Sequence, residues 1–310
     1  MNDYDQYDAL GLAELVRTKQ VTPGELLSEA RTRAEKAQSE LNCFSNMFDG
    51  AADAQIQSGL ADGPFTGVPY PIKDLGISIA GYPMTNGSVG WKDNIEPQDS
   101  VLATRYKAAG LTIFAQTTSP EWGLTTSTES QLYGQTRNPW DTTRTSGGSS
   151  GGASAAVAEG VVPAAHASDG GGSIRIPAAC TGLFGMIPSR GRTPMGPWVT
   201  EGWNGQSCHH AVSRCVRDSA ALLDISHGPE IGSRYVAPPP KGTYLEATQR
   251  DPGKLKIAVW TKAPNGHEGD TDAKAGVANT VKLLESLGHV VEEAGPQTDG
   301  EALSKSLMMT

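Results

Sequence analysis

Residues 146–182 read SGGSSGGASAAVAEGVVPAAHASDGGGSIRIPAACTG, so glycines and other small residues separate three regular segments. The small residues over 151–159 predict a closely packed helix, the apolar run near 161–167 predicts a strand, and a second helix is expected from Ser173. Helices that alternate with short strands are typical of α/β proteins. We therefore expect an α/β fold with a largely parallel or mixed sheet.

The same alternation continues on both sides of this stretch. Further elements are predicted, in chain order, at 8–18 (helix), from Thr22 (helix), 99–109 (helix), 111–116 (strand), 216–226 (helix), 256–260 (strand), 272–287 (helix) and 289–293 (strand). Residues 228–254 are rich in Pro, Gly and charge, which predicts a loop or linker. Residues 255–295 are then expected to form a βαβ-like peripheral segment.

Composition argues against several classes of function. Hydrophobic residues make up 37% and charged residues 19% of the 310, which suits a globular protein with a sizeable core. The net charge of −9 and the lack of a Lys/Arg-rich stretch disfavour direct nucleic-acid binding. No run of 18 apolar residues occurs, so no membrane span is expected. The acidic, polar start is unlike a secretory signal, which makes the cytoplasm the default expectation.

Cysteines and histidines show no metal-binding pattern. Cys43, Cys180, Cys208 and Cys215 form no CxxC pair, so we expect free or buried thiols. The six histidines contain no HExxH or similar spacing. The sequence therefore predicts neither a metal nor any other cofactor.

Three short segments carry residues that could do chemistry. GGSSGG occupies 147–152, DGGGSIR occupies 169–175, and GVPYPIKD occupies 67–74. Taken singly, each glycine run is open to two interpretations, a structural turn or a cradle of N–H groups for an anion. Neither GxxxxGK[ST] nor a GxGxxG after a strand occurs, so nucleotide binding is disfavoured.

Taken together, these segments meet the needs of acyl transfer from an amide. The reaction requires a nucleophile, a base, an acid for the leaving amine and donors to the oxyanion. Ser173 follows the glycines 170–172, whose N–H groups can converge on a developing oxyanion. Ser149 could pass a proton between Ser173 and a neutral lysine, a role open to Lys73 if burial lowers its pKa.

The three segments and their flanks resemble the amidase signature family of amide hydrolases. The similarity includes the run from Asn138 through GGSSGG and DGGGSIR to IPAACTG at 176–182, the lysine segment at 67–74, and the helix after Arg214. It extends over roughly residues 8–295 in order. The resemblance implies one domain over 1–310, with a central mixed β-sheet flanked by helices on both faces.

The resemblance also implies roles for individual residues. Lys73 would be the catalytic lysine, Ser149 the bridging serine after a cis peptide bond, and Ser173 the nucleophile. The N–H groups that would form the oxyanion hole belong to Gly170, Gly171, Gly172 and Ser173. Three more residues would support the site, the last two through a local ion pair: Ser150, Asp169 and Arg175.

Members of this family are longer, and their C-terminal part returns strands to the central sheet and lines the acyl pocket. This chain lacks a counterpart to that part. A fragment, a companion segment that supplies the rest, or a trimmed core would each explain the difference. In every case an open sheet edge and exposed apolar surface are expected, with poor solubility, a homo-oligomer or a companion C-terminal segment as the outcome.

Three functions remain open. The leading one is hydrolysis of a linear or cyclic carboxamide to a carboxylic acid plus ammonia or amine. The second is release of ammonia from glutamine by the A subunit of a tRNA-dependent amidotransferase, where a partner would hold the tRNA. The third is a non-catalytic, amidase-like module.

Substrate contacts are less defined by the sequence. Trp122, Thr125 and Trp203 are candidates for the pocket wall, where the tryptophans would favour apolar or aryl amides, although core packing would also explain them. His209 and His210 could line the pocket or serve packing or the surface, and Cys208 could lie nearby.

Overall fold

A computed structural model describes residues 3–263 and 266–309. The chain divides into two compact units, Met1–Thr248 and Gln249–Thr310. The α- and 3-10 helices of the first unit are η1 (Tyr4–Gln6), α1 (Ala9–Arg17), α2 (Pro23–Leu41), α3 (Asp49–Gln57), η2 (Val89–Trp91), α4 (Val101–Ala108), η3 (Glu121–Gly123), α5 (Gly151–Ala158), α6 (Arg175–Thr181), α7 (Val216–Ser226) and α8 (Tyr244–Thr248). Its strands are β1 (Phe44–Met47), β2 (Pro69–Lys73), β3 (Thr112–Thr117), β4 (Glu129–Ser130), β5 (Gly134–Gln135), β6 (Arg137–Asn138), β7 (Asp141–Thr145), β8 (Ala164–Asp169), β9 (Phe184–Gly185) and β10 (Cys208–Ser213).

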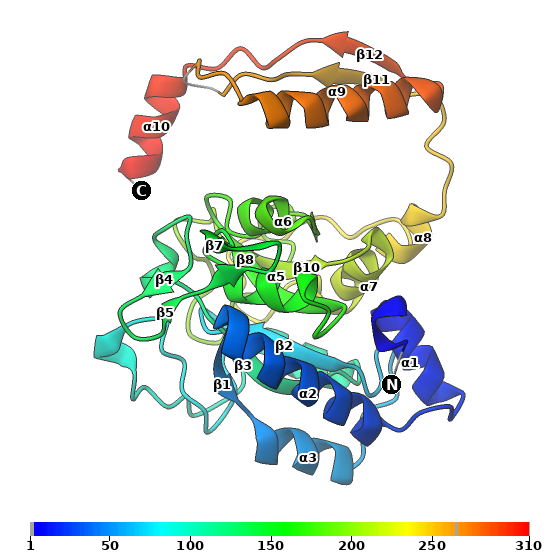
Figure 1. The fold of residues 1–310 in the computed structure, drawn as a ribbon, viewed down its shortest axis with the longest axis vertical. Helices are drawn as coiled ribbons and strands as arrows, with labels where there is room; N and C mark the ends of the chain where they lie inside the picture. The colour runs from blue at the N-terminus through cyan, green and yellow to red at the C-terminus, as the bar shows by residue number, and fades with distance from the viewer. Residues whose placement is uncertain (1–2, 264–265, 310) are drawn as a thin grey trace. The chain divides into compact units, whose positions relative to one another are not determined.

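The centre of the first unit is built from two three-stranded sheets (Figure 1). Their strand orders are β1-β3-β2 and β8-β10-β9. β2 and β3 run parallel, whereas β1–β3, β8–β10 and β9–β10 are antiparallel. β2 also contacts β8, so the two sheets continue one another in space. The mixed α/β fold expected from the sequence is confirmed.

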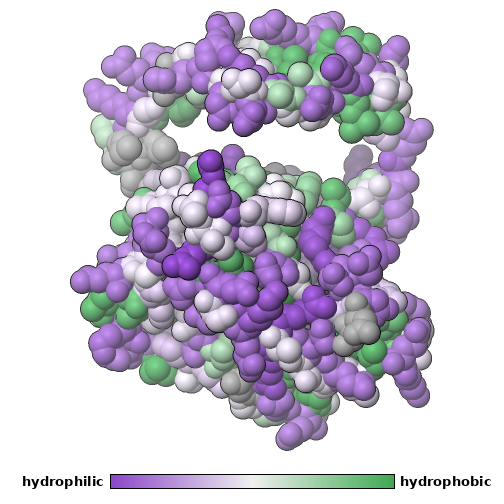
Figure 2. All heavy atoms as spheres, viewed as in Figure 1, coloured by the Kyte–Doolittle hydropathy of each residue, from purple (hydrophilic) through white to green (hydrophobic). Residues whose placement is uncertain are grey.

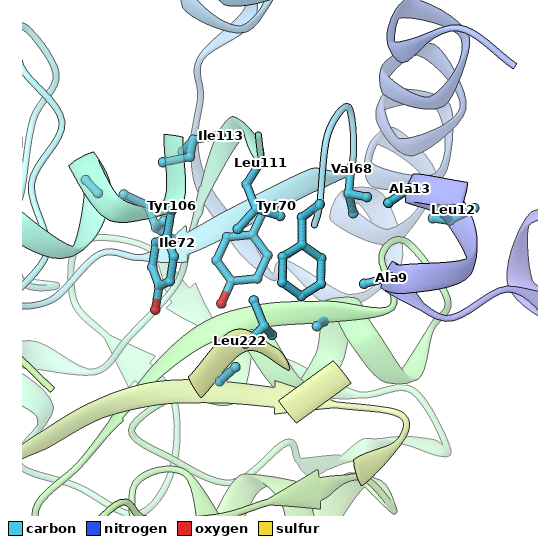
Figure 3. Packing of buried hydrophobic residues seen from close by; sticks show 14 of the residues in the cluster. Ala9, Leu12, Ala13, Val68, Tyr70, Ile72, Tyr106, Leu111, Ile113 and Leu222 are labelled. Atoms are coloured by element: carbon cyan, nitrogen blue, oxygen red, sulfur yellow. The ribbon is translucent and has the colours of Figure 1, made fainter. Parts of the chain in front are cut away.

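Helices cover both faces of these sheets. Alternate residues of a strand point to opposite faces, and the neighbours Ile113 and Phe114 of β3 belong to two different apolar clusters. The cluster around Ile113 includes side chains of α1, α4 and α7, several of which are labelled in Figure 3. The cluster around Phe114 includes side chains of α2 and α5. Each fully buried Leu, Ile or Phe in these clusters stabilises the folded state by about 1.5–3 kcal/mol relative to an exposed side chain.

α5 lies very close to the strands because its residues are small. Every residue from Gly151 to Val157 is buried. At Gly152 an added Cβ would stand 2.4 Å from Thr118 Oγ1 and 2.6 Å from the carbonyl oxygen of Cys43, so only glycine fits there. The close packing of α5 brings the serines at its N-terminal end against the ends of β2 and β8.

The N-terminal helix is attached to α7 by two carboxylates. Asp218 accepts the N–H groups of Ala9 at 2.7 Å and Leu10 at 3.2 Å. Asp8 caps α1 by accepting the N–H of Gly11 and forms an ion pair with Arg217. The Cys215 thiol lies beside both carboxylates. Because these oxygens already serve backbone amides and an arginine, their role is structural.

Residues 228–254, expected as a loop, contain the short helix α8. Asp224 of α7 accepts the N–H groups of Tyr244 and Leu245 at 2.6 and 3.0 Å, which holds α8 against α7. This helix was missed because its anchor lies on another element.

The second unit contains β11 (Lys256–Val259), α9 (Thr271–Ser286), β12 (Val290–Glu293) and α10 (Gly300–Met308). β11 and β12 are parallel, and α9 lies between them in the chain. That residues 1–310 form a single domain stays a prediction. Among the described residues, no helix is both long and apolar enough to cross a membrane. On the face seen in Figure 2 the first unit is largely hydrophilic, with apolar residues in small separate groups.

The close approach of α5 predicts an effect on stability. Gly152→Ala should lower the free energy of unfolding by about 1–3 kcal/mol, because the new methyl group meets backbone atoms that cannot move aside, and should lower Tm by roughly 2–10 °C. Gly50→Ala in α3 is the control, since among the described residues no atom beyond its chain neighbours and its own helix backbone lies within 4 Å of the added Cβ, and its Tm should stay equal or rise slightly. Equal melting temperatures for the two variants would contradict the packing described for α5.

Candidate active site

Lys73 ends β2 with its side chain fully buried. Its Nζ lies 2.7 Å from Ser149 Oγ and 3.1 Å from Ser168 Oγ. Burial lowers the pKa of Lys73 to about 7, against a smaller opposing effect of the Asp169 carboxylate. A lysine with this pKa is neutral in a large fraction of molecules near pH 7, so it can accept a proton.

The loop before α5 presents Ser149 to this lysine. Gly147 has φ +79°, and a Cβ there would stand 2.7 Å from Pro177 Cα, so glycine lets the loop pass close to α6. The peptide bond between Gly148 and Ser149 is cis. The Ser150 hydroxyl donates to the carbonyl oxygen of Ser168 at 3.2 Å, which ties the loop to β8.

Asp169 organises the second serine loop. It lies at the end of β8 with its side chain buried, and it accepts backbone N–H groups from Gly172, Ile174 and Arg175. The guanidinium of Arg175 also donates to both of its oxygens at 2.9 Å. Burial alone would raise the pKa of Asp169, but Arg175 and the backbone donors hold it below its usual value. Asp169 therefore stays ionised and fixes the turn.

This turn explains a difference from the expected secondary structure. A helix was predicted from Ser173, whereas α6 begins at Arg175. The N–H groups that would open the helix point at the Asp169 carboxylate instead. Ser173 consequently lies in the turn, half-buried, and its carbonyl oxygen accepts the N–H of Ser150 at 3.2 Å. The two serine loops are thus joined directly.

The glycine N–H groups of this turn are not equivalent. Gly172 has φ +132°, and its N–H donates to Asp169 Oδ1 at 2.8 Å. This amide, expected to belong to an oxyanion hole, is thus already engaged. The N–H groups of Gly171 and Ser173 have no acceptor within residues 3–263 and 266–309. They remain available to a ligand.

The aromatic candidates lie beside these loops. An added Cβ at Gly123, next to Trp122, would stand 3.1 Å from Ser149 Oγ, so the η3 turn packs on Ser149. The indole of Trp203 lies against Gly170, where a Cβ would stand 2.6 Å from its Cε3. Both tryptophans are 45% exposed, so core packing does not account for them. Thr125 is exposed, and its hydroxyl donates to the Ser127 carbonyl.

Two polar residues near Lys73 were not singled out from the sequence, His166 and Ser168. His166 Nδ1 accepts the backbone N–H of Lys73 at 3.2 Å. The signal that could have found them is the pair of polar residues in AAHASD (164–169), a strand that is otherwise made of alanine and ends in Asp169.

Three residues whose roles the sequence did not decide lie on β10, and all are buried: Cys208, His209 and His210. His209 Nδ1 lies 3.0 Å from His166 Nε2, whereas His210 bonds Ser219 Oγ at 2.7 Å. Burial raises the pKa of the Cys208 thiol, which keeps that thiol protonated.

Comparison with known proteins gives one consistent result. The family model described as Amidase matches residues 25–310. The 6-aminohexanoate-cyclic-dimer hydrolase of Paenarthrobacter ureafaciens is 37% identical over 300 residues, which are 95% of this chain and 60% of that protein. The lipoamidase of Enterococcus faecalis is 37% identical over 309 residues, 98% of this chain and 40% of that protein.

A solved structure of 6-aminohexanoate cyclic dimer hydrolase complexed with substrate superposes with a TM-score of 0.90 at 35% identity. The match covers 95% of this chain and 62% of that one. This chain therefore spans about 60% of the length of that hydrolase. Because the family model matches almost the whole sequence and the fold agrees with it, the chain belongs to the amidase family.

Proposed function

We propose that this protein hydrolyses a small carboxamide, linear or cyclic, to a carboxylic acid plus ammonia or an amine. The observation that carries the proposal is the contact of 2.7 Å between Lys73 Nζ and Ser149 Oγ in a site where Lys73 is fully buried. The lowered pKa of Lys73, about 7, suits a general base at neutral pH. The relatives whose printed names specify a cyclic-dimer hydrolase and a lipoamidase support the same chemistry.

In the first half of the reaction, Ser173 Oγ attacks the amide carbon. The proton of Ser173 passes to Ser149 Oγ while the proton of Ser149 passes to neutral Lys73. The C–N bond then breaks, and the proton held by Lys73 returns through Ser149 to the leaving nitrogen. Water attacks the Ser173 ester through the same relay, and the acid departs. Burial disfavours the charged form of Lys73, which makes it easier for the lysine to return the proton.

Oxyanion stabilisation is assigned to the N–H groups of Gly170, Gly171 and Ser173. Gly172 is left out of this set because its amide is bound by Asp169. Asp169 and Arg175 act by holding the turn that aims the other amides, which removes the need to reorganise them during the reaction.

The substrate wall is assigned to Trp122 and Trp203, whose exposed rings lie next to the two serine loops. An apolar acyl or amine chain of a linear or cyclic amide fits such a wall. The Thr125 hydroxyl donates to the Ser127 carbonyl, so we assign only the backbone of Thr125 to the substrate wall. No cofactor takes part in this scheme. A homo-oligomer or companion C-terminal segment, and a cytoplasmic location, stay predictions.

Ser173→Ala should abolish acyl-enzyme formation and lower kcat for an amide by at least about 10³-fold, since the proposed reaction has no other group to attack the amide carbon. Mass spectrometry of the parent after a fluorophosphonate probe should place the adduct on the peptide containing Ser173. An adduct on any other residue would contradict the assignment. A folded parent that takes up no probe would favour the non-catalytic module, and ammonia release from glutamine only with an added partner would favour the amidotransferase subunit.

Lys73 should govern one limb of the pH profile. The neutral fraction of a lysine rises as pH passes upward through its pKa, so kcat/KM for amides should rise with a midpoint at about pH 7. Lys73→Ala should remove this limb and about 10²–10⁴-fold of the rate. Ser149→Ala should slow amides more than activated esters, whose leaving groups need less protonation.

Ser154→Ala is a matched control for Ser149→Ala, because Ser154 lies further along α5 and its buried hydroxyl has no hydrogen-bond partner among the described residues. An unchanged pH profile in Lys73→Ala would rule out the Lys–Ser–Ser relay. His209 would not be a ready substitute base, because its Nδ1 is bound by His166.

Trp203→Ala should raise KM for amides with apolar chains while leaving small amides such as acetamide little changed, because only the longer chains reach the indole face. Trp140→Ala serves as the control. Trp140 is also an exposed tryptophan, but its Nε1 donates to the Thr181 carbonyl at the opposite end of α6. Steady-state kinetics over an amide series check this. Equal effects of the two substitutions would remove Trp203 from the substrate wall.

A further inference from the structure

β2 and β8 lie side by side without a backbone ladder between them in the described part of the chain. On its other side, β2 pairs with β3. The N–H of Lys73 therefore needs an acceptor from β8, and the His166 side chain provides it at 3.2 Å. A buried N–H without a partner is strongly unfavourable. The imidazole of His166 thus replaces a missing strand hydrogen bond at the residue that carries the general base.

This contact determines which nitrogen of each histidine carries a proton. Because His166 Nδ1 accepts an N–H, its proton must be on Nε2. His166 Nε2 lies 3.0 Å from His209 Nδ1, which must then be the acceptor, so the proton of His209 is on its Nε2. Both rings are buried and inclined by only 21° to each other. One backbone amide therefore sets the tautomers of two side chains in series.

The groups around the pair favour its neutral form. Lys73 from β2 and Tyr106 from α4 lie beside it, and His210, the next residue of β10, adds a smaller electrostatic effect on His166. Asp169 of β8 acts on Lys73, but its charge is already matched by Arg175. Burial and then the neighbouring basic groups hold the pKa of His166 well below its usual value, and burial and Lys73 lower that of His209 to about 4. Gly76 leaves room for the second ring, since a Cβ there would stand 3.1 Å from His209 Cε1.

We propose that His166 and His209 form a neutral positioning pair that fixes the main chain of Lys73 and so directs its Nζ to Ser149. The inference rests on the proposed function for the role of Lys73, whereas the hydrogen-bond chain itself does not. Neither histidine touches the reacting atoms. Without the chain, Lys73 would shift toward water and its neutral form would be less populated at pH 7.

Nitrogen-15 NMR of the intact protein labelled at histidine tests the chain directly and needs no activity. We expect His166 and His209 to give the signals of neutral rings protonated at Nε2 throughout pH 6–8. An imidazolium or an Nδ1–H tautomer at either position would overturn the proposal. Because this measurement does not involve catalysis, it separates failure of the pair from failure of the proposed hydrolysis.

Two substitutions at His166 separate its hydrogen bonds. The amide of asparagine occupies the place of Nδ1, so His166→Asn keeps an acceptor for Lys73, whereas the amide of glutamine occupies the place of Nε2, so His166→Gln does not. His166→Gln should lower kcat for amides by about 10²-fold through misplacement of Lys73 and move the limb near pH 7 upward, with KM little changed. His166→Asn should restore most of the rate and return the limb toward that of the parent.

His209 offers a second test if variants of His166 fail to fold. His209→Asn keeps an acceptor for His166 Nε2, while His209→Leu leaves that donor unpaired, so only the second should shift the pH limb. The control is His210→Asn, since His210 is the next residue of β10 and equally buried but bonds Ser219. It should leave the pH profile unchanged. Identical pH limbs in His166→Gln, His209→Leu and the parent would overturn the proposal.

Discussion

The rest of this site supports one contact, in which the Nζ of the buried Lys73 lies 2.7 Å from the Oγ of Ser149. In water the ammonium form would dominate at neutral pH, and the side chain would be useless as a base. Burial disfavours the ammonium form, but the fold must then accommodate a polar side chain between its strands. Small residues provide the tolerance: α5 carries no large side chain, so Ser149 reaches Lys73 with almost no solvent between the helix and the strands.

The turn over residues 170–174, proposed to bind the oxyanion, is held by a different principle. Its geometry comes from one carboxylate, Asp169, which collects backbone amides that a helix would otherwise leave unpaired. Arg175 compensates the charge, so the turn is rigid without any substrate present. The N–H of Gly172 is bound by Asp169, whereas the N–H groups of its neighbours Gly171 and Ser173 have no acceptor in the described part of the chain. The site therefore combines a buried lysine of lowered pKa with backbone N–H groups that are held in place, an arrangement that suits the proposed amide hydrolysis.

Sequence patterns predicted the features that short segments determine. The mixed α/β fold and the two serines that follow glycines, Ser149 and Ser173, were found from spacing over a few residues, and Lys73 was singled out within its segment GVPYPIKD. The features that were missed depend on partners far away in the chain. His166 meets the Lys73 amide across a separation of 93 residues. Likewise, α8 begins where the Asp224 carboxylate of α7 accepts the N–H groups of Tyr244 and Leu245.

The link between Asp218 and the amides of Ala9 and Leu10 has a consequence for biosynthesis. Its two ends are separated by 209 residues, so α1 emerges long before its anchor exists. At 5–20 residues per second, the ribosome needs roughly 10–40 seconds to make the intervening chain. Throughout that interval the N–H groups of Ala9 and Leu10 lack the carboxylate that accepts them in the folded protein. Until α7 is made, water must satisfy these amides instead, so this end of α1 gains its fixed position late in synthesis.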